Sequence, residues 1–151
     1  MRETWESGKQ MLSRLENIVS AVNKLNSITD EDIIMAVRKM KGRITCPYCK
    51  SPNIVKIGYI MRSGNFKIQR YKCKNCNRTF TELDGTPLKG AHSLKDIVIV
   101  AYLTLDLKLP PSSIAKILPI NRPKLYRAYK RVITNKEFFR KLIYILLKDE
   151  S

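Results

Sequence analysis

The sequence has no long hydrophobic run, and this absence excludes several kinds of protein. No segment is long and uncharged enough for a membrane-spanning helix, and the N-terminus has no signal-peptide hydrophobic region. We therefore expect no membrane association and a cytoplasmic location. The sequence also lacks a nucleophile–base pair, a phosphate-cradling glycine loop and a carboxylate dyad, so we expect no enzyme.

Acidic residues are missing from Ile33 to Thr81. The whole chain carries 29 Lys and Arg against 13 Asp and Glu, a formal net charge of +16. Such an excess indicates a polyanionic partner, and nucleic acid is the commonest one, with a membrane surface as the rival. The basic residues of the acid-free stretch are Arg38, Lys39, Lys41, Arg43, Lys50, Lys56, Arg62, Lys67, Arg70, Lys72, Lys74 and Arg78.

Cysteine occurs only four times, always in Cys-x-x-Cys pairs: Cys46 with Cys49, and Cys73 with Cys76. Two such pairs supply four soft ligands in a tetrahedral array, which suits one structural zinc ion and leaves no open position for catalysis. The alternatives are a redox pair, which normally occurs singly, two disulfides, which normally mark a secreted chain, and an iron–sulfur centre. The pairing of the two motifs favours zinc.

The segment between the pairs predicts a hairpin. Residues 54–60 and 66–72 are rich in β-formers and are joined by the turn-forming sequence Arg62–Asn65. A third short strand at 78–81 follows the second pair, so residues 43–90 describe a zinc ribbon. We expect its cations to contact phosphate groups of double-stranded DNA. These predicted contacts are Arg62, Lys67, Arg70, Lys72 and Arg78.

Residues 1–42 predict a helical hairpin. The first helix spans about residues 3–25, and Thr29 with Asp32 caps a second helix that ends near Gly42. The first helix carries an apolar stripe in the heptad rhythm, which suits either packing on the second helix and on the next domain or a homodimer seam. The stripe includes Trp5, Leu12, Leu15, Val19 and Val22.

Residues 91–151 predict three helices and a short final one. Ser93 caps a helix through Leu107, Ser112 or Ser113 opens a short helix at 114–118, and Asn121 caps the third. An apolar stripe of Leu125, Tyr129, Val132 and Ile133 predicts the buried side of that third helix. A basic helix after a short helix and a tight turn is typical of a helix-turn-helix that reads the major groove. The predicted DNA contacts are Asn121, Arg122, Lys124, Tyr126, Arg127, Lys130 and Arg131.

The predicted fold class is α+β and mostly α, and its motifs resemble a known family. Residues 46–49, 71–81 and 86–88, followed by 114–127, resemble the N-terminal zinc ribbon and helix-turn-helix of insertion-sequence transposases. The resemblance covers about residues 44–133. It implies a DNA-binding module of a mobile element, or a regulator recruited from one, and a nucleoid-associated location.

The resemblance has two departures. Residues 1–42 are outside the family pattern. A transposase also needs a domain whose acidic residues bind the catalytic metal ions, and the residues 134–151 that follow the third helix are too few to form one. Glu137, Asp149 and Glu150 are their acids, and a short helix at 138–147 fits there. We therefore expect DNA binding without transposase catalysis. The alternative is an adaptor that docks on a transcription or replication complex through the ribbon or the N-terminal helices. A third alternative is a truncated remnant without function.

Overall fold

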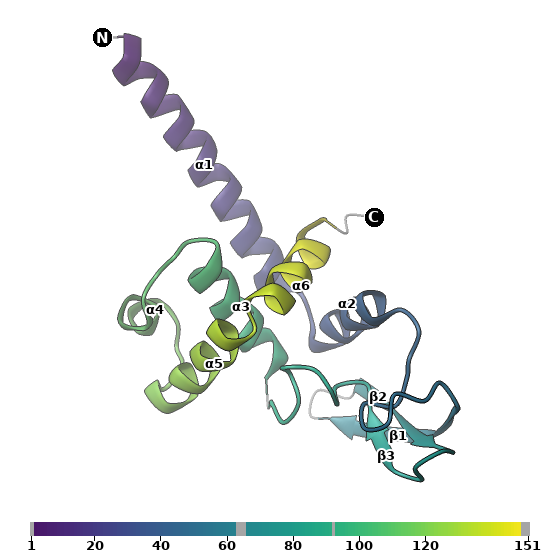
Figure 1. Ribbon diagram of the computed structural model, residues 1–151. Helices are drawn as coiled ribbons and strands as arrows, with labels where there is room; N and C mark the ends of the chain where they lie inside the picture. Colours follow the sequence, from purple (N-terminus) through teal and green to yellow (C-terminus); the bar gives the residue numbers. More distant parts are fainter. Residues whose placement is uncertain (1, 63–65, 92, 149–151) are drawn as a thin grey trace.

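A computed structural model describes residues 2–62, 66–91 and 93–148, with side chains from residue 8 and without those of residues 62 and 66. Within this part the chain is α+β and mostly helical, with six helices and one three-stranded antiparallel sheet (Figure 1). The fold class therefore agrees with the prediction at this level. Among the described helices, none is long and apolar enough to cross a membrane.

The two N-terminal helices are α1 (Arg2–Ser27) and α2 (Asp30–Lys41). The predicted cap is confirmed: the Asp32 amide donates to Thr29 Oγ1 at 3.1 Å, and the Thr29 amide donates to Asp32 Oδ2 at 2.9 Å. Gly42, with φ of 63°, follows the end of α2 and takes a conformation that is costly for other residues. The predicted hairpin is wrong in its packing, because α1 projects away from the body and α2 diverges from it (Figure 1). Both helices pack on the C-terminal helices instead.

The sheet consists of β1 (Ile54–Arg62), β2 (Phe66–Cys73) and β3 (Thr79–Thr81) in the order β1-β2-β3. All three predicted strands are confirmed within one or two residues. The β1–β2 register pairs Ile60 with Ile68 and shifts between Lys56 and Tyr59. Gly58 lies in this irregularity with φ of 112°. The predicted turn at residues 63–65 lies outside the described residues.

The C-terminal half contains α3 (Leu94–Leu105), α4 (Pro111–Ile117), α5 (Arg122–Thr134) and α6 (Lys136–Lys148). The predicted caps at Ser93 and Asn121 are confirmed. Two boundaries differ from the prediction: α3 ends two residues before Leu107, and α4 begins at Pro111 instead of after a serine cap. Pro111 suits the first helical position because its missing N–H has no intrahelical partner there.

Most buried apolar side chains form one core. Leu25 of α1 and Ile33 of α2 belong to the same cluster as Val98 of α3, Leu125 of α5 and Phe139 of α6. Residues 1–42 therefore share their core with residues 91–148. Burial of apolar area in this shared core is what holds the helices together.

A second, smaller core lies beside the sheet. Tyr71 and Phe80 stack with ring centroids 5.4 Å apart, and Cys46 and Cys73 are buried with them. So few apolar residues give this part little hydrophobic stabilisation of its own. The cysteine cluster is a further feature that can hold this part together.

Candidate metal centre and nucleic-acid interface

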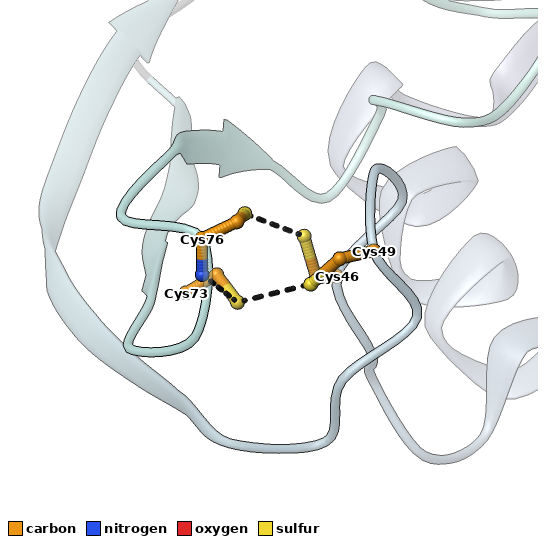
Figure 2. Close-up of side chains that lie close together, drawn as sticks. All are labelled: Cys46, Cys49, Cys73 and Cys76. Carbon is orange, nitrogen blue, oxygen red and sulfur yellow. Dashed lines mark hydrogen bonds between the residues drawn. The ribbon is translucent and has the colours of Figure 1, made fainter.

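The four cysteines converge on one point, as the sequence predicted. Each contributes a sulfur, and the four sulfurs lie within 4.8 Å of one another (Figure 2). The Sγ atoms of Cys46 and Cys76 are 3.7 Å apart, and those of Cys49 and Cys73 are 3.5 Å apart. Four thiolates around one zinc at a Zn–S distance of 2.3 Å would be about 3.8 Å apart. The sulfur cage therefore fits one tetrahedral metal ion.

Two similar turns hold these sulfurs. The Lys50 amide donates to the Cys46 carbonyl at 2.9 Å, and the Asn77 amide donates to the Cys73 carbonyl at 2.8 Å. Lys50 and Asn77 both take positive φ, 65° and 63°, the left-handed conformation that closes each turn. The same local geometry thus recurs in both Cys-x-x-Cys segments, and each turn directs its two thiols toward the other pair.

Hydrogen-bond donors favour the ionised form of some of these thiols. The Asn75 side-chain amide, 3.6 Å from the Cys49 sulfur, and the Ser51 backbone lower the pKa of Cys49 to about 6. The backbone N–H of Arg78 acts to lower the pKa of Cys76, but burial and the three neighbouring thiols raise it to about 11. Four thiols this close cannot all ionise without a cation between them. A divalent metal would remove that conflict.

The α5 helix places its cations on one face. Leu125, Ala128 and Val132 are buried, which anchors the helix on α3. The predicted contacts on the opposite face are exposed, except one that is half-buried. The exposed ones are Asn121, Arg122, Lys124, Tyr126, Arg127 and Lys130.

The half-buried exception is Arg131. Its Nη1 donates to the Pro87 carbonyl at 2.9 Å and to the Lys89 carbonyl at 2.7 Å. The guanidinium thus joins α5 to the segment between β3 and α3. The sequence assigned Arg131 to DNA contact, whereas these bonds give it a positioning role within the chain.

Two exposed polar groups at the start of α5 also have local partners. Asn121 Oδ1 accepts from the Lys124 amide at 2.9 Å, and Arg127 Nε donates to the Pro123 carbonyl at 3.2 Å. The first bond caps the helix and the second holds the Arg127 stem along the first turn. Because this bond holds the guanidinium in one direction, the two Nη atoms of Arg127 can contact a target at a fixed position.

The sheet carries a separate group of predicted contacts. Lys67, Lys72 and Arg78 are exposed and Arg70 is half-buried. Lys67 Nζ lies 5.5 Å from the centre of the Tyr59 ring, and Arg78 lies 4.8 Å from that of Tyr48. The side chain of Arg62 lies outside the described residues. In Figure 1 the sheet and α5 lie apart, on either side of the segment that joins β3 to α3, so these cations and those of α5 form two patches.

Sequence reasoning missed a partly buried ion pair between α2 and the residue that follows β3. Arg38 donates from Nε to Glu82 Oε2 at 2.5 Å and from Nη2 to Oε1 at 2.7 Å. Glu82 also accepts from the Gln69 amide at 2.9 Å, and Lys41 Nζ donates to the carbonyls of Glu82 and Asp84. Arg38 and Lys41 had been assigned to the phosphate-binding stretch, and here they fix α2 to the sheet.

This network had a signal in the sequence. Glu82 is the first acidic residue after the acid-free stretch, so it was the obvious partner for a cation from that stretch. The hydrogen bond to Glu82 raises the pKa of Arg38 above its ordinary value, whereas burial lowers the pKa of Lys41 below its ordinary value. Both cations thus bind partners within the chain.

Comparison with known proteins relates the chain to mobile elements. No family model matches the chain, and no solved structure matches it. An uncharacterized protein in transposable element ISH50 of Halobacterium salinarum is 24% identical over 102 residues. The matched segment covers 66% of this chain and 33% of that protein, so the chain corresponds to about a third of the relative. The chain is thus similar to a transposable-element protein and carries a four-cysteine cluster that can hold a metal.

Proposed function

We propose that this chain binds double-stranded DNA, as part of a mobile-element protein or of a regulator derived from one. In this proposal α4, the turn at residues 118–121 and α5 form a helix-turn-helix, and α5 enters the major groove. The observation that carries the proposal is the division of α5 into a buried apolar side and an exposed side with Arg122, Lys124 and Arg127. A nucleoid-associated location follows from it.

The cysteine cluster has a structural role in this proposal. Cys46, Cys49, Cys73 and Cys76 hold one zinc ion and stabilise the sheet as a zinc ribbon. Bound zinc keeps the two turns together and supplies no chemistry, because four protein ligands complete its tetrahedral coordination. In this proposal the metal centre therefore has a structural and not a catalytic role.

The two cationic patches have different tasks. Lys67, Lys72 and Arg78, with the half-buried Arg70, contact phosphates and give affinity without sequence preference. The start of α5 contacts base edges and gives the preference. The formal net charge of +16 and the similarity to a transposable-element protein support this assignment. The activity of the much longer relative is not carried over to this chain.

The proposal is tested in two steps. A preferred duplex is first selected from a pool of random sequences by its binding to the protein, and the affinity of each variant for that duplex and for a scrambled one is then measured by titration. Replacing Arg122 or Arg127 by Ala should weaken binding to the selected duplex by about 1–3 kcal/mol and leave binding to a scrambled duplex nearly unchanged. Lys72→Ala should weaken both duplexes equally and reduce the salt dependence. Lys141→Ala, on α6, is the matched control for loss of one charge. If the α5 variants weaken both duplexes equally, α5 is only a phosphate contact.

An adaptor role is the second candidate, and exposed apolar residues on β1 favour it. Tyr59, Ile60 and Met61 are 60%, 41% and 56% exposed, and because side chains alternate along a strand, this end of β1 presents apolar groups on both faces of the sheet. Such a surface suits docking on a transcription or replication protein. If Ile60→Asp abolishes function in cells while DNA affinity in vitro stays unchanged, the adaptor role is favoured over DNA recognition.

A further inference from the structure

The α1 helix exposes an apolar stripe that no described part of this chain covers. From residue 8 to residue 20 every side chain is exposed except the half-buried Ile18. Leu12, Leu15 and Val19 are 62%, 49% and 56% exposed along a helix that projects from the body (Figure 1). A helix without packing contacts is marginally stable in water, so its apolar side favours association with a partner.

The spacing of the stripe selects a second helix as its partner. Leu12, Leu15, Val19 and Val22 recur at alternating steps of three and four residues, the a and d positions of a coiled coil. A stripe of this kind is narrow and suits a single facing helix better than a sheet or a broad groove.

The charge of α1 sets it apart from the rest of the chain. It carries four basic and three acidic residues, whereas the whole chain has a net charge of +16. Nearly neutral helices can approach one another without the repulsion that two copies of the basic sheet or of α5 would experience. This composition disfavours phosphate binding by α1 and favours a second copy of the same helix.

We infer that α1 pairs in antiparallel orientation with α1 of a second copy, so that Leu12 faces the partner's Leu15. In this register Lys9 and Glu16 occupy e positions, and Lys9 lies next to the partner's Glu16 on both sides of the two-fold axis. Met11 and Ile18 flank the other side of the seam. The pairing thus sets Leu12 against the partner's Leu15, leaves Val19 opposite the partner's Gly8, and places opposite charges together.

Other arrangements lack this complementarity. Shifting the antiparallel pair by one heptad places Glu16 next to the partner's Glu16, which is repulsive. A parallel pair places Glu16 next to the partner's Met11 and forms no ion pair at the seam. The shifted antiparallel pair sets Leu12 against the partner's Val22 and Leu15 against the partner's Val19, so it is the charges and not the apolar contacts that favour the proposed register.

The antiparallel pair has a geometric consequence. The two bodies lie at opposite ends of the paired helices, because α1 enters its own core near Leu25. At a rise of 1.5 Å per residue the two Leu25 positions are about 35 Å apart. The α5 helix contributes no residue to the paired surface.

Sedimentation equilibrium of the full chain tests the pairing. The wild type should be a dimer at micromolar concentrations, and Leu15→Arg should shift it to monomer by at least a tenfold weaker association. Asn17→Arg adds the same charge on the opposite side of the helix and should leave the dimer intact. A wild-type chain that stays monomeric at 100 µM overturns the inference and leaves the stripe to another protein.

A charge exchange tests the register. Lys9→Glu alone places like charges together at the seam and should weaken the dimer, as should Glu16→Lys alone. The double exchange restores opposite charges and should recover most of the wild-type association constant. If the single exchanges have no effect, or the double exchange does not recover, the antiparallel register is wrong. An unchanged melting temperature of the rest of the chain in each variant shows that the shared core is still folded.

Discussion

The ion pair between Arg38 of α2 and Glu82 joins two side chains that differ greatly in burial. Glu82 has a side chain only 1% exposed, whereas its partner Arg38 is 48% exposed. Removing Arg38 leaves a buried carboxylate that still accepts a hydrogen bond from the backbone N–H of Gln69 but has lost its guanidinium partner. Removing the charge of Glu82 leaves an arginine that water can reach. The two substitutions should therefore have unequal costs even though they break the same ion pair.

The magnitudes follow from burial. Arg38→Met keeps the apolar stem but strips a buried charge of its partner, which costs about 3–5 kcal/mol. Glu82→Gln keeps an acceptor for the Gln69 amide and loses hydrogen bonds to a charged group, which costs about 1.5–3 kcal/mol. The double variant Arg38→Met with Glu82→Gln should be more stable than Arg38→Met alone, because neutral glutamine needs no cation.

Urea unfolding of metal-loaded protein, followed by circular dichroism, measures these free energies. Lys141→Met is the control: its pair with Glu137 is 3.2 Å long but exposed, so its loss should cost less than about 1 kcal/mol. If Arg38→Met costs no more than Lys141→Met, or if the double variant is the least stable, the account of the buried carboxylate is refuted.

Two further predictions concern the metal centre and the glycines. Purified protein should contain one zinc ion per chain by elemental analysis, and Cys73→Ser should lose the metal and the Tyr71–Phe80 packing while the helices keep their circular dichroism signal; a retained metal, or an iron–sulfur absorption band, contradicts this. Gly85 has φ of 81° and an added Cβ would lie 3.3 Å from the Pro47 Cβ, so Gly85→Ala should lower the free energy of unfolding by about 1 kcal/mol or more, measured by urea unfolding. In contrast Gly8→Ala, in open space within α1, should stabilise by about 0.5–1 kcal/mol, and equal signs for the two would contradict the backbone argument.

Local chemistry made much of the fold predictable. The caps at Thr29, Ser93 and Asn121 depend on side chains within three residues, so the sequence alone located three helix starts. The alternation of β-formers between the cysteine pairs likewise located the sheet. The four-cysteine cluster followed from ligand type and spacing, because a Cys-x-x-Cys turn directs both thiols to one point.

Contacts between distant segments were not predictable in this way. The direction of α1 depends on the core that α3 and α6 offer to Leu25, not on the sequence of α1 itself. Arg38 and Arg131 read as surface cations, and only the fold brings Glu82 and the Pro87 carbonyl to them. Counting basic residues cannot separate those that bind an external phosphate from those that bind the chain.

The central claim is that α5 reads DNA in the major groove, and methylation interference tests it directly. Methylation of guanine N7 blocks the major groove without changing the phosphates. On a selected duplex, such methylation should prevent binding of the wild type at a few positions, and one or more of them should become insensitive when Arg122, Lys124 or Arg127 is replaced by Ala. Binding that is indifferent to N7 methylation at every position would contradict the claim.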